Sequence, residues 1–563
     1  MKALCIWYSP FFLVLLLGIF VRRRRWKLFS MVVFGILFIT AFVFNTVAIL
    51  YYPVGKTIVG VELFQLLKGQ NISVLFGYLQ EYWTLLLVLL IVVFSIIRLV
   101  SSLTITCSRR TRYYFMVFHV LIVALLARGS VSLKPLNLLD AYAQLSNEEV
   151  ASAVTPVYVL IESFTMQQID YKPYYSDHEL VESLVDDHRK YTPFLIQQPN
   201  ICLILLESFG KEYTGINNCG RPSYTPFLDS LMSKSINFTN AYANGLRSID
   251  AVASCYSGIP SLMKQPFIGS RYCQVDIKSL PTVLGRNGYE TSFFHGADEL
   301  SMGFKPYLES AQIGAYYAEQ DYPNPEDFDG TWGIYDGPFL QFCKTKLTAQ
   351  KQPWFSGIFT LSSHHPYKLP TQYKNLPKGT AEIHRSILYA DKSLQLFFDS
   401  IQTEPWFDHT IFMITADHTS INETPEYQNY RGKYAVPLLV YAPAFFSPAT
   451  IEKPVQHIDI YTTVQYLASS GEHLAFGENL LDFTRKADIL LYDGNVHAYI
   501  SDSFALEWHG EQFSKLYAYR TDPKHLNDLS SQKLGVSDSL LQRLKLYKQK
   551  FNYRLLNNNF TIQ

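Results

Sequence analysis

The chain has no net charge, because its 48 lysine and arginine residues balance 48 aspartate and glutamate residues. No basic stripe occurs beyond the first quarter of the chain, so nucleic acid is a poor candidate partner. The sequence also lacks a Cys-x-x-C pair, which argues against a cysteine-ligated metal site. Internal repeats and low-complexity tracts are absent as well, which argues against a repeat architecture.

Cysteine is scarce, with seven residues in 563. Cys5 and Cys107 fall in or near an apolar N-terminal region, and five others follow it: Cys202, Cys219, Cys255, Cys273 and Cys343. An odd number leaves at least one thiol unpaired or paired between chains. We expect Cys202 to be a core thiol. Cys255 and Cys273 could form a disulfide, although sequence alone does not decide the connectivity.

Charge is absent from residues 31–52, an apolar run that is long enough to cross a bilayer. A spanning helix needs about 20 such residues. Shorter apolar runs at 6–21, 83–97 and 113–127 reach that length when the flanking Trp, Tyr and Ser residues are included. We therefore predict a membrane-embedded anchor of about four helices over residues 1–130.

Two basic clusters, at residues 22–27 and 109–112, predict the orientation of this anchor. Basic loops stay in the cytoplasm, and two predicted spans separate the clusters, so both would face inward. A fourth span would then carry everything after about Arg128 to the outer side. The first cluster follows an apolar run instead of preceding it, which argues against a cleaved signal peptide. These features indicate a multi-pass protein of the plasma (inner) membrane with an extracytoplasmic catalytic domain.

The rest of the chain divides into three predicted parts. Residues 131–195 have mixed composition and are expected to form a helical connector at the membrane surface. Over residues 196–525, apolar strand-like runs alternate with helical stretches, which predicts an α/β domain whose mostly parallel central sheet is flanked by helices. Residues 526–563 are rich in Leu, Lys and Gln and are expected to form a C-terminal helical tail.

Ligand-type residues follow two of the predicted strands. The apolar run from Ile201 to Leu206 ends at Glu207, and the run that starts at His409 ends in Asp417 and His418. Ligands of open α/β sheets collect at the carboxyl ends of the strands. Two carboxylates and an imidazole would supply the oxygen and nitrogen ligands of a divalent metal with an open coordination position. An Asp-His pair could instead cap a helix or satisfy a loop backbone.

Between these strands, Gly245 predicts a tight turn and Arg247-Ser248 stands at the predicted start of a helix. Ser248 could be a helix N-cap. It could also be a nucleophile, since a hydroxyl at a helix N-terminus beside a divalent cation has a lowered pKa. These two interpretations are compatible, because a helix N-terminus also binds the anion that is being transferred.

Two histidines also follow strand-like runs, His295 in ETSFFHGADE and His364 in GIFTLSSHHPY. An imidazole at such a position could hold a phosphate oxygen or protonate a leaving alkoxide. Taken singly, each fits an ordinary loop histidine better than a functional one. Trp332, in GTWGIYDGP, is a candidate wall of the pocket, although packing is the usual role of a lone tryptophan.

Together these residues resemble the alkaline phosphatase superfamily, and within it the lipoteichoic acid synthase and phosphoglycerol transferase branch. The resemblance covers nearly the whole chain and is carried by LLESFG, NGLRSIDA, FFHG, TWGIYDGPF, TLSSHHPY, and TADH followed by VPLLVYAP. It implies that Glu207, Ser248, Asp417 and His418 bind one divalent metal, usually manganese, with magnesium or zinc as alternatives. It also implies that Ser248 is the nucleophile, and it makes Arg247, His295, Trp332 and His364 candidates for substrate binding.

The chain departs from this branch at several positions. The nucleophile of the branch is usually threonine, whereas this chain has Ser248 at that position. The synthases hold glycerol phosphate with a tryptophan and an arginine, whereas this chain reads ADELSMGFK, with Met302 and Phe304 near those places, which puts the glycerol-phosphate assignment in doubt. They have five membrane spans where four are predicted here. Sulfatases need a C/S-x-P-x-R pattern, which the residues after Ser248 do not supply, so a sulfatase is disfavoured.

We therefore predict a membrane-anchored, metal-dependent transferase. It would take a phospho-alcohol head group, of the phosphoglycerol type, from a membrane phospholipid to a glycan or glycolipid acceptor outside the cytoplasm, through a phosphoserine intermediate. A phosphoethanolamine transferase or a phosphodiesterase of the same superfamily is the alternative. A non-catalytic membrane regulator is a third possibility. In such a protein we would expect some of the metal-ligating residues to be missing.

Overall fold

The structure is a computed structural model that divides the chain into two compact units, Met1–Gln167 and Gln168–Gln563. It describes residues 169, 171–185, 188–191 and 198–558, except 217, 219–221, 271, 274–276, 469, 470, 475 and 485, together with scattered positions between 29 and 122. The predicted spans at 6–21, 31–52, 83–97 and 113–127 lie outside the described residues or retain only scattered ones. Within the part that is described, no helix combines the length and the apolar character that a membrane crossing requires.

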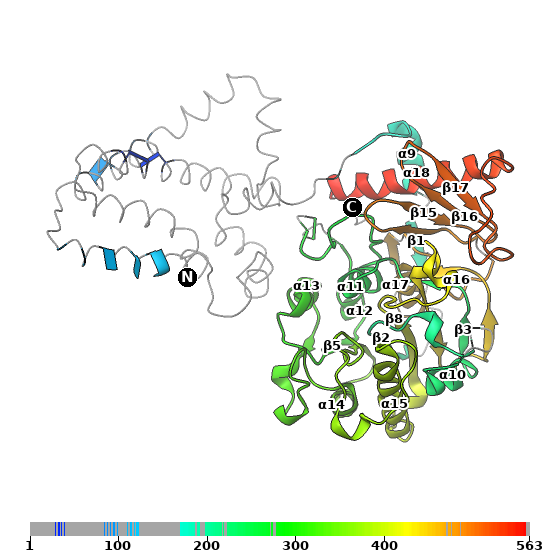
Figure 1. Ribbon diagram of the computed structural model, residues 1–563, viewed down its shortest axis with the longest axis horizontal. Helices are drawn as coiled ribbons and strands as arrows, with labels where there is room; N and C mark the ends of the chain where they lie inside the picture. The colour runs from blue at the N-terminus through cyan, green and yellow to red at the C-terminus, as the bar shows by residue number, and fades with distance from the viewer. Residues whose placement is uncertain are drawn as a thin grey trace. The chain divides into compact units, whose positions relative to one another are not determined.

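An eight-stranded sheet forms the centre of the second unit, in the order β11-β3-β10-β8-β2-β7-β5-β6 (Figure 1). Five neighbouring strands, β8, β2, β7, β5 and β6, are parallel, whereas β10 is antiparallel to both β8 and β3. The strands are β2 (Asn200–Leu206), β3 (Ile236–Phe238), β5 (Glu290–His295), β6 (Ala315–Tyr317), β7 (Trp354–Phe359), β8 (Thr410–Ala416), β10 (Leu438–Tyr441) and β11 (Ala449–Ile451). The prediction of a mostly parallel central sheet is confirmed.

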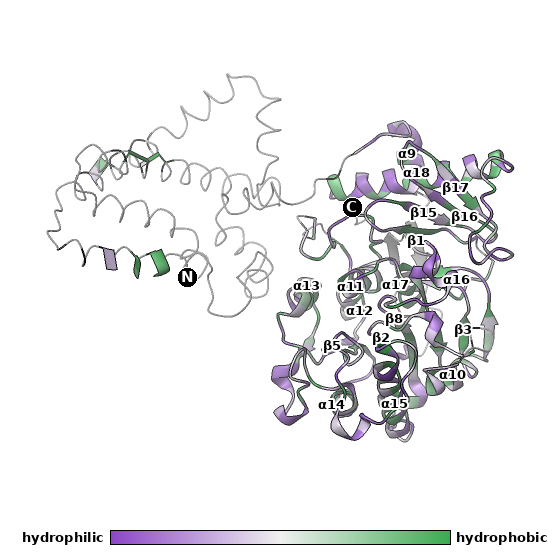
Figure 2. Ribbon diagram, in the orientation of Figure 1, coloured by the Kyte–Doolittle hydropathy of each residue, from purple (hydrophilic) through white to green (hydrophobic). Residues whose placement is uncertain are grey.

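The central strands are buried along their whole length. Every residue of β2, β7 and β8 is buried, as expected for parallel strands covered on both faces. Figure 2 shows these strands as largely hydrophobic and the outer loops as more hydrophilic. Leu206 of β2 pairs with Ala416 of β8, so Glu207 and Asp417 leave the sheet at the same level.

Helices cover the sheet in two groups (Figure 1). In one group α15 packs against α10 and α14, and in the other α17 packs against α11 and α12. The helices of this part are α10 (Pro226–Met232), α11 (Ser248–Ser257), α12 (Leu280–Arg286), α13 (Phe304–Ser310), α14 (Asp336–Ala349), α15 (Ile383–Ile401), α16 (Pro425–Gln428) and α17 (His457–Ala468). This arrangement is the α/β architecture that the alternating sequence pattern predicted.

A second sheet follows the central one and was not expected from the sequence. It is antiparallel and comprises β14 (Ile489–Tyr492), β15 (His497–Ile500), β16 (Ala505–Trp508) and β17 (Ser514–Tyr517). The long helix α18 (Leu534–Leu556) packs on β15, β16 and β17, and also on α9 (Asp177–Val185). Two small sheets complete the unit: β1 (His188–Tyr191) with β13 (Gly471–Leu474), and β4 (Ala241–Tyr242) between β9 (Ala435–Val436) and β12 (Val455–Gln456).

The suggested disulfide between Cys255 and Cys273 is wrong, because both residues are free thiols. Cys255 is fully buried inside α11, whereas Cys273 lies in the loop that follows that helix. Cys202 is a buried free thiol on β2, as expected, and Cys343 is a buried free thiol on α14. Cys219 lies outside the described residues.

Candidate active site

Glu207 follows directly on the last residue of β2, and hydrogen bonds fix it there. Its backbone N–H donates to Thr360 Oγ1 at 2.9 Å, and Ser363 Oγ donates to its carbonyl oxygen. Ser208 has a left-handed backbone (φ 59°), and its hydroxyl donates to Glu207 Oε1 at 2.7 Å. The Glu207 side chain is 1% exposed, so a carboxylate is held almost out of contact with water.

Asp417 occupies the equivalent place at the end of the neighbouring strand, β8. Its Oδ1 accepts hydrogen bonds from the backbone N–H groups of Ser208 and His418, each at 2.7 Å. Its other oxygen, Oδ2, is buried and has no hydrogen-bond partner among the residues that the structure describes. A buried carboxylate oxygen without a partner is costly, and a bound cation would satisfy it.

His418 is oriented by its own loop. Its Nδ1 lies 2.6 Å from the carbonyl oxygen of Thr419, which can only accept, so Nδ1 carries the proton. This tautomer leaves a lone pair on Nε2, and Nε2 lies 3.3 Å from Asp417 Oδ2. A histidine whose second nitrogen is bound to a backbone carbonyl is the usual arrangement of a metal ligand.

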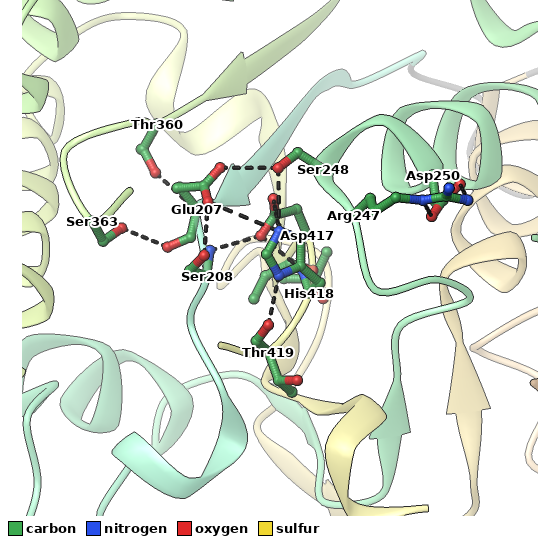
Figure 3. A network of polar contacts seen from close by, with 12 residues as sticks. Glu207, Ser208, Arg247, Ser248, Asp250, Thr360, Ser363, Asp417, His418 and Thr419 are labelled. Carbon is green, nitrogen blue, oxygen red and sulfur yellow. Dashed lines mark hydrogen bonds and ion pairs between the residues drawn. The ribbon is translucent and has the colours of Figure 1, made fainter. Parts of the chain in front are cut away.

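Ser248 is the first residue of α11 and reaches the same place from a third element. Its Oγ lies 3.2 Å from Glu207 Oε2 and 3.2 Å from His418 Nε2 (Figure 3). The turn before it requires Gly245, because a Cβ there would lie 2.4 Å from the Cβ of Asp250. The hydroxyl therefore stands at a helix N-terminus, beside two of the ligand-type side chains.

The arrangement suits a divalent cation. One ligand atom each from Glu207, Asp417 and His418 lies within 4.8 Å of the other two. Burial, and then the charge of Asp417, raise the pKa of Glu207 well above its usual range. The geometry thus brings two acidic groups together, and among the described residues no lysine or arginine forms an ion pair with either of them. A metal ion would compensate that charge.

Arg247 does not join this group. Its guanidinium Nε and Nη2 donate to the two carboxylate oxygens of Asp250, at 2.8 and 3.1 Å, and Nη1 donates to the carbonyl of Lys264 at 3.0 Å. Figure 3 shows the Arg247 side chain pointing away from Ser248 and toward Asp250. In this conformation it braces the first turn of α11.

His295 ends β5 and is 1% exposed. Its Nδ1 lies 3.2 Å from the carbonyl of Phe359, and its buried Nε2 has no hydrogen-bond partner in the described part of the chain. Burial lowers the pKa of His295 to about 4, so the imidazole is neutral at pH 7. The ring of Phe304 packs against it, with the centroids 5.4 Å apart. Phe304, at one of the two departures from the synthases, therefore packs an apolar ring against the His295 imidazole.

His364 and Trp332 lie together in the loops beside the site. Their ring centroids are 4.3 Å apart, and Trp332 Nε1 donates to the carbonyl of His365 at 2.6 Å. The loop after β7 that carries His364 also carries Ser363, which binds the Glu207 carbonyl. His364 therefore directly follows a residue that is hydrogen-bonded to Glu207.

Three positioning residues were missed in the sequence. Thr360 binds the backbone of Glu207, and the buried carboxylate of Asp336, at the start of α14, accepts from the N–H groups of Leu361 and Ser362. His457, at the start of α17, lies 2.8 Å through Nε2 from the carbonyl of Ala416, next to Asp417. Of the three, only Asp336 has a recognisable pattern, as an acidic residue in the first turn of a helix.

Comparison with known proteins agrees with this geometry. Residues 199–470 match the sulfatase family. The chain is 24% identical to lipoteichoic acid synthase 1 of Bacillus subtilis over 63% of this chain and 59% of that protein. It is 23% identical to phosphoglycerol transferase I of Escherichia coli over 41% of this chain and 32% of that protein. The match therefore spans less than two thirds of the length of these relatives.

Two solved structures share the fold. One is a protein of the alkaline phosphatase superfamily from Vibrio parahaemolyticus, with a TM-score of 0.60 and 20% identity over 76% of this chain and 97% of that one. The other is the lipoteichoic acid synthase LtaP from Listeria monocytogenes, with a TM-score of 0.54 and 21% identity over 63% of this chain and 92% of that one. Residues 199–470 thus match the sulfatase family in sequence, and the chain shares its fold with these two solved structures.

Proposed function

We propose that the chain is a metal-dependent phosphotransferase that moves a phospho-alcohol head group from a membrane phospholipid to an extracytoplasmic acceptor. The observation that carries the proposal is the position of Ser248 Oγ, 3.2 Å from both Glu207 and His418 at the start of a helix. Beside it, the buried Oδ2 of Asp417 has no partner. A nucleophile, a cation site and an anion-binding helix end therefore coincide.

Glu207, Asp417, His418 and Ser248 would hold the ion, for which we propose manganese, with magnesium or zinc as alternatives. A divalent cation there would lower the pKa of the Ser248 hydroxyl and stabilise charge on the phosphoryl oxygens. The chain itself supplies orientation: Thr360 and Ser363 fix Glu207, and the N-terminus of α11, where Ser248 lies, would bind the phosphate.

The reaction would proceed in two displacements. In the first, Ser248 Oγ forms a bond to phosphorus while the bond from phosphorus to the diacylglycerol oxygen breaks, and diacylglycerol leaves with the proton. In the second, an acceptor hydroxyl forms a bond to phosphorus, the bond to Ser248 breaks, and the serine regains a proton. His364 is the candidate that relays these protons, because it is partly exposed, whereas burial keeps His295 neutral.

The donor, the acceptor and the location are inferred from the relatives. Their names describe synthesis of lipoteichoic acid and transfer of phosphoglycerol, so we propose a membrane phospholipid as donor and a glycan or glycolipid as acceptor. The predicted anchor at residues 1–130 would keep the site at the outer surface of the plasma membrane, which raises the effective concentration of the donor.

The decisive experiment uses the full chain in detergent with manganese and labelled phosphatidylglycerol or phosphatidylethanolamine. We expect diacylglycerol release, and Ser248→Ala should reduce it by about a thousandfold or more. Ser248→Thr is the matched control, since it keeps a hydroxyl at the same position. Full activity of Ser248→Ala would exclude the nucleophile and favour a binding role.

A second candidate function, phosphoethanolamine transfer, is favoured by one observation. Phe304 is fully buried against His295, so it adds no polar group that could bind the hydroxyls of a glycerol head group. Comparing label transfer from the two lipids separates these functions. Label released into water alone would indicate a phosphodiesterase.

A further inference from the structure

A groove of about 830 Å³ lies beside the candidate active site. It is bounded by the 3₁₀ turns Pro325–Asp327 and Thr371–Tyr373 and by the facing surfaces of α14 and α15. None of the residues proposed to bind the metal or the phosphate lines it. The groove is therefore a separate surface.

Aromatic rings form much of its wall. Tyr373 and Tyr335 pack on Tyr389, with ring centroids 4.8 and 6.1 Å apart, and the Tyr389 hydroxyl accepts from the N–H of Gly337. Tyr389 is buried and supports the wall, whereas Tyr335 and Tyr373 are partly exposed. Phe328 and Leu396, which are 37% and 40% exposed, add apolar surface to the same groove.

The polar part of the wall is electrically balanced. Two acidic residues, Glu326 and Asp327, and two basic residues, Lys368 and Lys374, line the groove. The amide of Gln341 adds a further donor and acceptor. A long polyanion would meet as many negative as positive groups here, so the wall lacks the single-sign charge that such a ligand selects.

This combination suits a neutral carbohydrate. Tyrosine rings offer flat apolar faces for the C–H surface of a sugar, and their hydroxyl groups remain available for hydrogen bonds. Carboxylate, amide and ammonium groups can bind sugar hydroxyls as acceptors and donors. The wall of the groove is about as polar as it is apolar, so it offers both kinds of contact to a sugar.

The groove continues from the segments that carry His364 and Trp332. Lys368 lies four residues after His364, and Tyr335 lies three residues after Trp332. The hydrogen bond from Trp332 Nε1 to the His365 carbonyl joins the two segments. Asp336, between Tyr335 and Gly337 of the groove, accepts from the N–H of Ser362, and the next residue, Ser363, donates to the Glu207 carbonyl. A ligand in the groove would thus extend toward the phosphate position.

We infer that this groove binds the sugar chain of the acceptor, as a neutral oligosaccharide whose free hydroxyl is directed toward Ser248. The inference rests on the proposed function, because it assigns the acceptor of that reaction. It adds a ligand class and a place, with Tyr335 and Tyr373 as the residues that stack on the sugar rings.

The test measures binding separately from transfer. The full chain carrying Ser248→Ala is titrated in detergent with neutral glucan hexasaccharides of α-1,4, β-1,3 and β-1,6 linkage, and with a poly(glycerol phosphate) oligomer. We expect at least one glucan to bind. Tyr373→Ala or Tyr335→Ala should raise its Kd by about tenfold. Tyr553→Ala, on α18 outside the groove, should leave the Kd unchanged.

The opposite results are equally clear. If none of the glucans binds, or if only the oligomer binds and Lys368→Gln with Lys374→Gln abolishes this, the carbohydrate assignment is wrong. Diacylglycerol release without any acceptor is measured in parallel on chains with Ser248 intact. Loss of glucan binding with normal release in Tyr373→Ala supports the groove, whereas no release by the unmodified chain would contradict the proposed function and leave the binding result standing.

Discussion

Replacing Asp417 with asparagine should stabilise the metal-free protein and remove the stabilisation that a metal provides. The substitution keeps the size of the side chain. It also keeps Oδ1, which accepts the two backbone hydrogen bonds from Ser208 and His418. The changed atom is Oδ2, which is buried and accepts no hydrogen bond from any described residue.

The magnitude follows from the spacing of the charges. Ligand atoms of Glu207 and Asp417 lie within 4.8 Å of each other, and two like charges at that distance repel by about 3.5 kcal/mol at an effective dielectric constant of about 20. Burial and the Asp417 charge also raise the pKa of Glu207. The metal-free wild type therefore carries either this repulsion or the cost of taking up a proton, and the asparagine variant carries neither. We expect a gain of up to about 3 kcal/mol in its free energy of unfolding.

Urea unfolding with chelator and with excess manganese provides the assay. Manganese at about 100 times its Kd should stabilise the wild type by about 2.7 kcal/mol and the variant much less. Asp229→Asn is the control, because its carboxylate accepts from Gly215 N–H, Ile216 N–H and the Ser223 hydroxyl and should lose stability with or without metal. A metal-free Asp417→Asn protein that is less stable than the wild type would refute the reasoning.

Three further predictions concern stability away from the site. Burial lowers the pKa of His497 to about 3, against about 6.5 in the unfolded chain. The neutral imidazole therefore makes its full contribution to the free energy of unfolding above pH 6.5 and loses it as the pH falls. From pH 8 to pH 5, the wild type should lose about 2 kcal/mol more than His497→Gln in urea unfolding. Gly357→Ala would place a Cβ 1.5 Å from the buried Tyr256 hydroxyl oxygen, so it should cost about 3 kcal/mol or more, and adding Tyr256→Phe should recover part of the loss in thermal unfolding. Leu203→Ala, in the fully buried β2, should cost about 3 kcal/mol, whereas Leu526→Ala, at a side chain that is 76% exposed, should cost little; equal losses would contradict the burial pattern.

Strand ends were the most predictable feature. The apolar runs before Glu207 and Asp417 indicated buried strands, and the structure places both runs next to each other, in register to the last residue. Because parallel strands bring their carboxyl ends to one edge, the convergence of these carboxylates follows from the pattern. The position of Ser248 at the start of a helix was predicted from the turn and helix-start patterns of the sequence.

Other features depend on contacts that the sequence pattern does not predict. Arg247 binds Asp250, three residues later in the same helix turn, and this local ion pair competes with any role at the phosphate. His457 reaches Ala416 from a helix 41 residues further along the chain. The antiparallel sheet β14 to β17 consists of four-residue strands, which are too short to give a clear periodic signal.

The burial of β2 and β8 has a consequence for how an ion would leave the protein. Glu207 and Asp417 are continuations of two fully buried, fully paired strands and do not lie on a loop tip that could open alone. Such core strands exchange their amide hydrogens only when the whole domain unfolds. Loss of the ion past the partly exposed His418 should therefore leave Glu207 and Asp417 in place, because it does not require the strands to unfold. The metal-free protein should then take up manganese again without refolding.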